Sequence, residues 1–328
     1  MKILPVFISH LGCPFNCIYC DQRIITKSHS LNLKKIDSLV ADFCHYNKAL
    51  TKEIAFYGGT FTNLEPKMQK SLLQIIEKYS DPKTTLRIST RPDCIDDEKL
   101  KLCHRFNVNC IELGIQSFSN QVLLKSGRGY TQKQAIQACR SVKEKGFKLS
   151  IQLMPGLPGS DWESWLKTQK LTLQLAPDYV RIYPTIVLKG TRLEVLYKKR
   201  IYTPLKLLEA IELCSDMVYK LRKTKIRIIK LGLHSDIDHT KIVAGPYHQN
   251  FGELVKSQLL IKEIIANFET GKSLILSQSD THLLKGFGKS GLKRLKNVLN
   301  LQKIPIILDN NLPSGNFSFT SEEAMEKW

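Results

Sequence analysis

The chain has 328 residues, of which 42% are hydrophobic, enough to build the cores of one large domain and a smaller one. No apolar run approaches the roughly 20 residues of a membrane-spanning helix, and the start of the chain turns polar too soon for a signal peptide, so we expect a cytoplasmic protein. The net charge of +19 is large for an enzyme of small metabolites and indicates a nucleic-acid partner, although the bias of a Lys- and Ile-rich genome is an alternative source.

Segments with the periodicity of strands and of helices alternate along the first two thirds of the chain, with a repeat of about 35 residues. The predicted strands are residues 3–9, 53–57, 85–90, 108–116, 147–154 and 179–183. Six β/α units imply a parallel sheet with right-handed crossovers, and we predict an α/β fold, a partial (β/α)6 barrel of the TIM type. We place this core at residues 1–233 and a small C-terminal α+β module at residues 234–328. In such barrels the loops at the carboxyl ends of the strands form the active site.

Three cysteines follow the first predicted strand in the pattern C-x3-C-x2-C, at Cys13, Cys17 and Cys20. Three thiolates so close together can ligate three corners of a [4Fe–4S] cluster, which leaves one iron open for chemistry. A structural zinc site is one alternative, but it needs four ligands, and His10 is awkwardly placed as the fourth. A disulfide is another, but it would leave one thiol over and needs an oxidising compartment. The other six cysteines are scattered, and we expect buried thiols.

The loops after the later strands also carry residues suited to ligand binding. Gly58 and Gly59, followed by Thr60, come directly after the second strand, and two glycines let a ligand approach the backbone closely. Three further segments at strand ends are Thr90-Arg91-Pro92-Asp93, Met154-Pro155-Gly156-Leu157-Pro158-Gly159-Ser160 and Ile182-Tyr183-Pro184-Thr185. Each segment alone fits an ordinary β/α turn, but their joint order is far more specific.

The cysteine motif and the Gly-Gly segment together resemble the radical S-adenosylmethionine (SAM) enzymes. In that superfamily the amino and carboxylate groups of SAM chelate the open iron, and an electron from the cluster cleaves SAM to a 5′-deoxyadenosyl radical. The three later segments resemble the core of the catalytic subunit of Elongator, which modifies the wobble uridine of tRNA, over roughly residues 3–205. The cysteine spacing here is narrower than in that subunit. The region after the core, about 95 residues, is too short for its acetyltransferase domain, so we expect a short relative that lacks this domain.

A more distant resemblance, to the oxygen-independent coproporphyrinogen dehydrogenases, implies which residues contact SAM. The implied contacts are Phe7, Tyr19, Gly58, Gly59, Thr60, Gln116, Arg128 and Gln152. Phe7 would lie beside the cluster and SAM, and the backbone of Tyr19 against the adenine. Gly58, Gly59 and Thr60 would receive the amino group, Arg128 the carboxylate, and Gln116 the ribose or the linker. Gln152 stands where that family has Asp, and Ser89 where both families usually carry Glu.

The positive charge is concentrated toward the end of the chain. Residues 220–230 and 285–303 are rich in Lys and Arg and contain no acidic residue, which is typical of a nucleic-acid-binding surface. A polar group, His234, Asp236, Asp238 and His239, fits a solvated loop better than a second metal site.

The order of elements in the C-terminal module is that of a minimal KH fold. A predicted strand, 273–277, and a short helix precede the sequence Gly288-Lys289-Ser290-Gly291, and a basic helix and a second strand, 304–308, follow it. In KH modules the GxxG loop clamps the backbone of single-stranded RNA. A plain glycine-rich turn and an accessory cap over the barrel are the alternatives. We expect the tail from residue 310 onward to be disordered.

These features predict an enzyme that binds a [4Fe–4S] cluster and SAM, generates a 5′-deoxyadenosyl radical, and modifies RNA, above all tRNA. A flavodoxin or ferredoxin would supply the electron, and no membrane partner is expected. The first alternative is a radical SAM enzyme that acts on a small molecule such as a tetrapyrrole. The second is a non-catalytic iron–sulfur protein, which would bind RNA without cleaving SAM.

Overall fold

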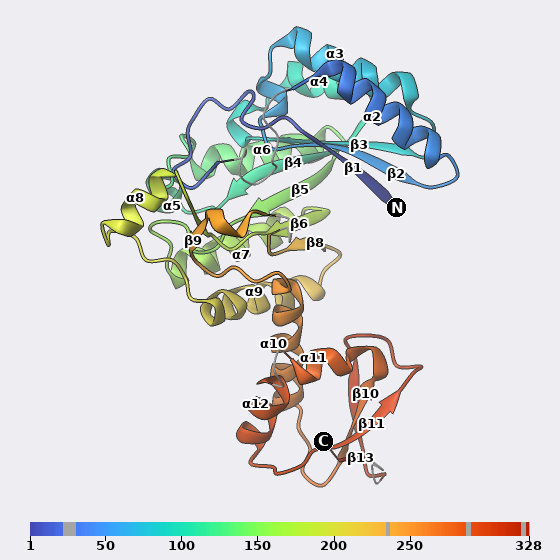
Figure 1. Ribbon diagram of the computed structural model, residues 1–328, viewed down its shortest axis with the longest axis vertical. Coiled ribbons are helices and arrows are strands. Elements are labelled where there is room, and N and C mark those ends of the chain that lie inside the picture. Colours follow the sequence, from blue (N-terminus) through green and yellow to red (C-terminus); the bar gives the residue numbers. More distant parts are fainter. Residues whose placement is uncertain (22–30, 234–236, 287–289, 323–325, 328) are drawn as a thin grey trace. The chain divides into compact units, whose positions relative to one another are not determined.

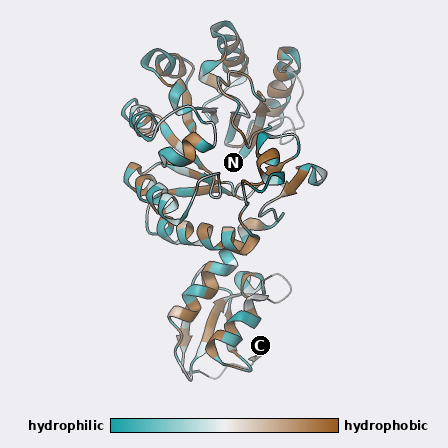
Figure 2. Cartoon of the chain, turned by 90° about the vertical axis from the view of Figure 1, so that its left-hand side faces the viewer, coloured by the Kyte–Doolittle hydropathy of each residue, from teal (hydrophilic) through white to brown (hydrophobic). Residues whose placement is uncertain are grey.

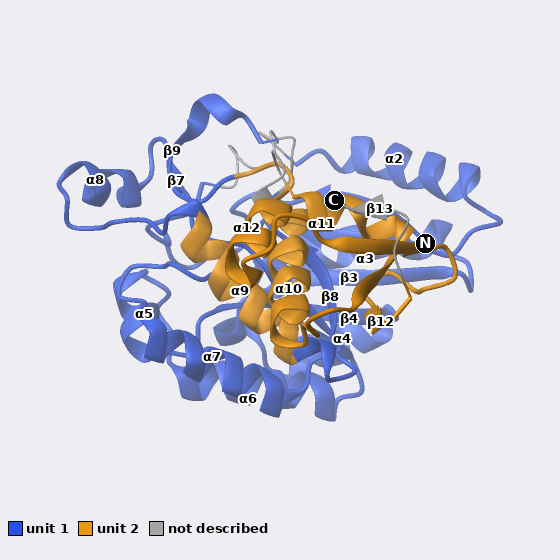
Figure 3. Ribbon diagram, turned by 90° about the horizontal axis from the view of Figure 1, so that it is seen from below, with its two compact units in different colours: residues 1–207, 221–247 blue, residues 208–220, 248–328 orange. Residues whose placement is uncertain are grey.

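The computed structural model describes residues 1–21, 31–233, 237–286, 290–322 and 326–327. The chain forms two compact units, which Figure 3 shows in different colours. Unit 1 contains Met1–Leu207 and Leu221–Tyr247, and unit 2 contains Leu208–Lys220 and His248–Trp328. These units are defined by contacts within the folded chain, whereas a domain is a part that folds independently. The predicted domain boundary after residue 233 therefore stays a prediction. No helix in the described part of the chain is both long enough and apolar enough to cross a bilayer.

Unit 1 is built around one sheet of seven parallel strands (Figure 1). In their order across the sheet, the strands are β1 (Lys2–Phe7), β2 (Lys52–Tyr57), β3 (Thr84–Thr90), β4 (Val108–Gln116), β5 (Lys148–Leu153), β6 (Tyr179–Ile182) and β8 (Arg227–Leu231). The predicted partial (β/α) barrel is confirmed, and β8 extends it by a seventh parallel strand beside β6. A separate two-stranded sheet pairs β7 (Val187–Leu188) with β9 (Ile242–Ala244).

Helices connect these strands and lie in an arc around them (Figure 2). The helices described in unit 1 are α2 (Leu33–Tyr46), α3 (Pro66–Tyr79), α4 (Asp97–Arg105), α5 (Asn120–Lys125), α6 (Gln132–Glu144), α7 (Trp162–Leu175) and α8 (Arg192–Lys198). Local sequence fixes where several of them begin. At α6 the side chains of Thr131 and Gln134 each accept a hydrogen bond from the other residue's N–H, a capping box that satisfies two free donors of the first turn.

The strands of the large sheet alternate apolar and polar residues. The face toward the helices carries fully buried apolar side chains, among them Ile54, Phe56, Ile88, Ile111 and Ile151. Because side chains alternate along a strand, the residues between them point to the other face, the interior of the partial barrel. Four buried charged residues lie on that face, namely Glu53, Arg87, Glu112 and Arg181. Their charges balance, since Arg87 pairs with Glu53 and Arg181 with Glu112.

Unit 2 packs helices against a small sheet. Its elements are the middle part of α9 (Leu207–Arg222), α10 (Phe251–Ala266), β10 (Ser273–Ser277), α11 (Thr281–Lys285), α12 (Ser290–Leu299), β11 (Pro305–Asp309), β12 (Phe317–Thr320) and β13 (Glu326–Lys327). The strand order is β12-β10-β11-β13, with β10 and β11 parallel and the two outer strands antiparallel to them. Leu276, Leu284 and Leu295 are fully buried in its core.

The expectation of a disordered tail after residue 310 is wrong. β12 pairs with β10, and Phe317 and Phe319 pack on the core of unit 2. The fully buried carboxylate of Asp280 accepts hydrogen bonds from the Ser314 hydroxyl and the Gly315 N–H, which fixes the turn before β12. Apolar residues at every second position, 317 and 319, are a strand signal that the polar turn ahead of them obscured.

Half of the predicted GxxG loop, residues 288–291, lies outside the described residues, since Gly288 and Lys289 are not described and Ser290 and Gly291 belong to α12. The order strand, helix, helix, strand is present as β10, α11, α12 and β11. Gly291 lies in α12 close to the end of α11, since a Cβ there would come within 2.6 Å of the Leu284 carbonyl oxygen. This glycine is therefore needed for packing, and RNA binding by the loop stays a prediction.

Candidate functional site

The cysteine loop, residues 8–21, leaves the carboxyl end of β1 and is fixed to segments that follow β2, β4 and β7 in the chain. The backbone hydrogen bonds are His10 N–H to Gly58 O (2.8 Å), Thr60 N–H to Leu11 O (2.9 Å), Ile18 N–H to Ser126 O (3.2 Å) and Leu193 N–H to Ile18 O (2.8 Å). The side-chain amide of Asn63 also donates to Gly12 O (2.8 Å). The loop therefore lies at the carboxyl edge of the sheet, where barrels of this type form their active sites.

Two glycines let the cysteine loop pack directly against the loop after β2. A Cβ on Gly12 would lie 2.3 Å from the Thr60 carbonyl oxygen, and Gly12 has a φ of +73°, which favours glycine. A Cβ on Gly59 would lie 2.5 Å from the Ile8 carbonyl oxygen. The Gly-Gly segment is thus needed for contact between the two backbones, besides the SAM contact that the resemblance implies.

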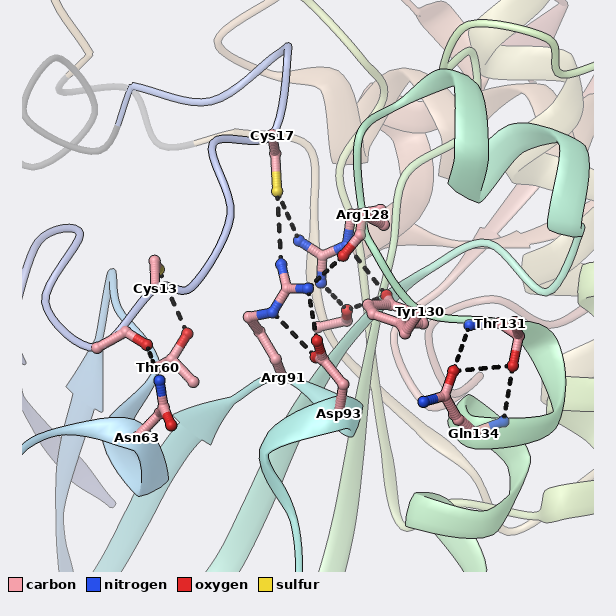
Figure 4. Close-up of polar contacts among 12 residues, drawn as sticks. Cys13, Cys17, Thr60, Asn63, Arg91, Asp93, Arg128, Tyr130, Thr131 and Gln134 are labelled. Carbon is pink, nitrogen blue, oxygen red and sulfur yellow. Dashed lines mark hydrogen bonds and ion pairs between the residues drawn. The ribbon is translucent and has the colours of Figure 1, made fainter.

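The three cysteines of the loop have different neighbours. The Cys13 thiol lies 3.3 Å from the Thr60 hydroxyl. The Cys17 thiol accepts hydrogen bonds from Nη1 of Arg128 (3.2 Å) and Nη1 of Arg91 (3.7 Å), as Figure 4 shows. Over the described ranges, no three His, Cys, Asp or Glu side chains are grouped as metal ligands, so the structure does not bring the three thiols together. Because metal binding can itself bring ligands into position, and because the three cysteines share one short loop, the loop remains a candidate cluster site.

A cavity of about 510 Å³ opens beside the cysteine loop. Phe7, Cys17 and Cys20 line it, so three of the residues predicted to lie near the cluster meet at one space. Gly190 and Thr191, which precede α8, line it from another part of the chain. The cavity provides room for a ligand between the end of β1 and the start of α8.

Arg128 is the strongest indication of an anionic ligand. The residue is 5% exposed, and its guanidinium donates to Cys17, to the hydroxyls of Tyr130 (3.0 Å) and Tyr19 (3.2 Å), and to the Gly114 carbonyl. None of these partners is a carboxylate. Although burial opposes its charge, Tyr130, Tyr19 and Cys17 hold the pKa of Arg128 well above its ordinary value. A buried cation without a counter-charge is costly, and a thiolate-bound cluster and the carboxylate of SAM both supply one.

Arg91 is a second buried arginine at Cys17, and we predicted no role for it from the sequence. Its Nε and Nη2 each donate to one carboxylate oxygen of Asp93, both at 2.9 Å. Nη2 also donates to the Arg128 carbonyl oxygen. The ring of Phe15, in the cysteine loop, lies 5.0 Å from the guanidinium carbon. The signal in the sequence was the Arg-Pro-Asp spacing directly after a strand, which places a carboxylate within reach of the guanidinium.

The motif cysteines differ from the others in their surroundings. The other six are buried, as predicted. Burial raises the pKa of Cys103, Cys110 and Cys139 to about 12, which keeps these thiols protonated. Burial also raises the pKa of Cys13. Its hydrogen bond with Thr60 and the positive charges of Arg91 and Arg128 oppose this shift, whereas the nearby Cys17 adds to it. Positive charge beside a thiol favours the thiolate, the form that binds iron.

The two predicted glutamines meet at the carboxyl ends of β4 and β5. Gln152 Nε2 donates to Gln116 Oε1 (3.2 Å), and Gln116 has a left-handed φ of +64°. Such a conformation costs about 1–3 kcal/mol in a residue other than glycine and clusters at functional sites. Gly114 leaves space between Gln116 and Arg128, since a Cβ there would lie 2.9 Å from Gln116 Nε2 and 3.4 Å from Arg128 Nη2. The structure therefore brings together three of the predicted SAM contacts.

Ser89, where the resembled families usually carry Glu, lies beside a carboxylate from the next strand. Its hydroxyl donates to Glu112 Oε1 (3.1 Å), and Glu112 Oε2 accepts from Ser150 (3.1 Å) and pairs with Arg181 Nε (2.7 Å). Arg181 in turn donates to the hydroxyls of Tyr57 and Tyr183. We did not predict this network from the sequence, although a glutamate between Ile111 and Leu113 in an apolar strand was a signal for it.

The other candidate metal ligands have different surroundings. His10 Nε2 lies 3.5 Å from Asp21 Oδ1, outside any grouped ligand set among the described residues. Asp238 caps the short helix His239–Lys241, and the ring of His239 packs edge-on against Tyr247. His234 and Asp236 lie outside the described residues.

Comparison with known proteins identifies the family. The model of the radical SAM superfamily matches residues 7–172, and that of the radical SAM C-terminal domain matches residues 177–260. The chain belongs to the radical SAM superfamily. A [4Fe–4S] cluster and SAM are the cofactors of this superfamily, and therefore of this protein.

Several radical SAM relatives have stated functions. A tRNA uridine(34) acetyltransferase of Methanocaldococcus jannaschii is 36% identical over 173 residues, which cover 52% of this chain and 31% of that protein. The heme chaperone HemW of Bacillus subtilis is 28% identical over 201 residues, 58% of this chain and 53% of that protein. The solved structure of Methanocaldococcus infernus Elp3 matches with a TM-score of 0.64 at 26% identity, over 80% of this chain and 63% of that one. The chain spans less than two thirds of each of these proteins.

Proposed function

We propose that this radical SAM protein generates a 5′-deoxyadenosyl radical and uses it to modify tRNA. The observation that supports the radical chemistry is the positive charge at Cys17. Arg91 and Arg128 are both buried there, and among the residues that the structure describes Asp93 is their single carboxylate partner. A net positive, buried site at the carboxyl edge of the barrel fits an anionic cluster and the SAM carboxylate.

The chain's own residues then have distinct tasks. Cys13, Cys17 and Cys20 hold the cluster, and the cavity beside Phe7 and Cys20 receives SAM. Arg128 orients the SAM carboxylate. The paired amides of Gln116 and Gln152 lie next to Arg128, where they can hydrogen-bond other parts of SAM. When bound, the cluster supplies an electron, and SAM supplies the radical. On the interior face of the sheet, two buried ion pairs fill space that water would otherwise occupy. They are Arg87–Glu53 and Arg181–Glu112.

The first test is iron content together with SAM cleavage. Reconstituted without oxygen, the wild-type protein should carry about four iron and four sulfide ions per chain. With dithionite it should convert SAM to 5′-deoxyadenosine and methionine. Cys13→Ala, Cys17→Ala and Cys20→Ala should each lose the cluster and the activity, because three thiolates are the minimum ligand set. Cys139→Ala should keep both, because that thiol is buried and protonated.

Two outcomes would contradict this assignment. Stoichiometric zinc in place of iron would show that the thiols form a different metal site. A fully loaded and reduced cluster that yields no deoxyadenosine would favour the non-catalytic iron–sulfur protein.

The proposal of a tRNA substrate has two supports. The first is the surplus of positive charge, +19 over the chain. Lys225 and Arg227 in unit 1 are exposed, and so are Lys293 and Arg294 on α12 in unit 2. The second is the similarity to tRNA uridine(34) acetyltransferases and to an archaeal Elp3. The similarity to HemW keeps a tetrapyrrole-type ligand as the second candidate.

Salt dependence of binding separates the two candidates. The logarithm of tRNA affinity should fall linearly with the logarithm of salt concentration, by about 0.7–0.9 per phosphate contacted, because bound cations release counterions. The double variants Lys225→Glu/Arg227→Glu and Lys293→Glu/Arg294→Glu should each lower this slope. A matched control is Lys67→Glu/Lys70→Glu, two exposed lysines on α3 that change the net charge equally.

The control shows whether specific surfaces or the total charge bind RNA. If all three double variants weaken binding equally, the charge acts non-specifically. If the wild type shows no measurable tRNA binding at low salt, the tRNA proposal fails and the small-molecule candidate takes its place.

A further inference from the structure

We propose that Arg91, held by Asp93, is a positioning residue that tunes the cluster at Cys17 and orients Arg128 for SAM. This inference rests on the proposed cluster and SAM site. It assigns a task to a residue that belongs neither to the cysteine motif nor to the implied SAM contacts.

The geometry of the guanidinium group fixes where Arg91 points. It is planar, so once two of its N–H groups are directed at a carboxylate, the direction of the third nitrogen is fixed. Nε and Nη2 of Arg91 are both engaged with Asp93 at 2.9 Å. Nη1 then faces the Cys17 sulfur at 3.7 Å. The rings of Phe15 and Tyr130, whose centroids lie 5.0 and 5.4 Å from the guanidinium carbon, further restrict the group, and Arg91 as a whole is buried.

Two positive charges lie next to the Cys17 sulfur. Arg91 and Arg128 both direct a nitrogen at the same sulfur, and two cations so close repel each other. Asp93 offsets part of this repulsion, and an anionic thiolate offsets more. Hydrogen bonds to cluster sulfurs and nearby net charge set the reduction potential of iron–sulfur centres. Because a cation favours the more negative, reduced state, Arg91 raises the potential of a cluster bound at Cys17.

Arg91 also fixes the backbone of Arg128, the residue that the resemblance assigns to the SAM carboxylate. Nη2 of Arg91 also donates to the carbonyl oxygen of Arg128, which lies between Gly127 (φ +67°) and Gly129 (φ +75°). Glycines flank Arg128 on both sides, so its backbone has unusual freedom. The hydrogen bond from Arg91 removes that freedom. The Arg128 guanidinium is thereby presented in one orientation to the group it binds.

The test compares Arg91→Gln and Arg91→Lys with the wild type, and with Arg140→Gln, the same change on the exposed side of α6. Iron content, the midpoint potential of the cluster in an EPR-monitored titration, and the dissociation constant for SAM are measured on full-length protein. Arg91→Gln should shift the potential to more negative values and weaken SAM binding at least tenfold, the effect of one lost charge-assisted hydrogen bond. Arg91→Lys keeps the charge but not the planar fork, so it should restore most of the potential and little of the SAM affinity. Arg140→Gln should change neither.

The outcomes separate the inference from the proposed function. A wild-type protein that binds no cluster or no SAM would overturn both. A loaded wild type and an Arg91→Gln variant with the same potential and SAM affinity would overturn the inference alone. If Arg91→Gln does not fold by circular dichroism, Arg91→Lys decides, because a purely structural role predicts that SAM affinity returns with the fold.

Discussion

Replacing Gly12 with alanine should abolish iron–sulfur binding while the fold persists. The new Cβ would lie 2.3 Å from the Thr60 carbonyl oxygen, so the cysteine loop and the loop after β2 must move apart. That movement breaks the hydrogen bonds that fix the loop, among them the one from Asn63 to Gly12 O. We expect reconstituted iron to fall below about a tenth of the wild-type value, with unchanged far-ultraviolet circular dichroism, since a close-packed contact tolerates little displacement.

A matched control separates this collision from backbone strain. Gly146 has a φ of +80°, close to the +73° of Gly12, but a Cβ there would meet nothing within 4 Å. Gly146→Ala should therefore cost about 1–2 kcal/mol of stability from the left-handed conformation alone and leave iron binding intact. If Gly12→Ala binds iron as well as Gly146→Ala does, the close approach of the two loops is unimportant for the site.

The second large effect is expected on stability, from Glu112. Its buried carboxylate pairs with Arg181 (2.7 Å) and lies 3.6 Å from Arg87. Arg87 keeps a second carboxylate, Glu53, whereas Glu112 is the one carboxylate that pairs with Arg181 in the part of the chain that the structure describes. Glu112→Ala therefore leaves an uncompensated buried cation, which should lower the free energy of unfolding by about 3–5 kcal/mol.

Urea unfolding followed by circular dichroism measures this loss. Glu65→Ala, at an exposed glutamate before α3, is the control and should stay within about 0.5 kcal/mol of the wild type. A loss below about 1 kcal/mol for Glu112→Ala would mean that water reaches the barrel interior and solvates Arg181. The buried network would then be a hydrated surface, and its role in excluding water from the site would be contradicted.

The two compact units explain why some elements were easier to predict than others. The strands of unit 1 alternate buried apolar residues with polar ones, and each is followed by a helix with its own capping signal, as at Thr131. Sequence patterns of this kind act over a few residues and need no knowledge of the fold. In unit 2, β12 depends on pairing with β10 and on a turn fixed by Asp280, about 35 residues away in the chain. A local pattern contains no information on such partners.

The candidate site also has a part that local sequence predicts and a part that depends on distant residues. Cys13, Cys17 and Cys20 lie within eight consecutive residues of one loop, so their spacing in the sequence is enough to suggest the ligands of one cluster, and the motif predicted the family that the comparisons confirm. The fold class followed in the same way from the regular alternation of strands and helices. Neither depends on long-range contacts.

Tertiary structure alone decided what surrounds the thiols. Arg91 and Arg128 meet Cys17 from positions 74 and 111 residues away, and Glu112 on β4 meets Arg181 on β6 across the strand β5 that lies between them. Which side chains meet across a sheet depends on strand register, and a shift of one residue would turn each of them to the opposite face. The cysteine motif is therefore determined by the sequence itself. The two guanidinium groups beside Cys17, and the buried ion pairs on the interior face of the sheet, come together only because the folded sheet fixes that register.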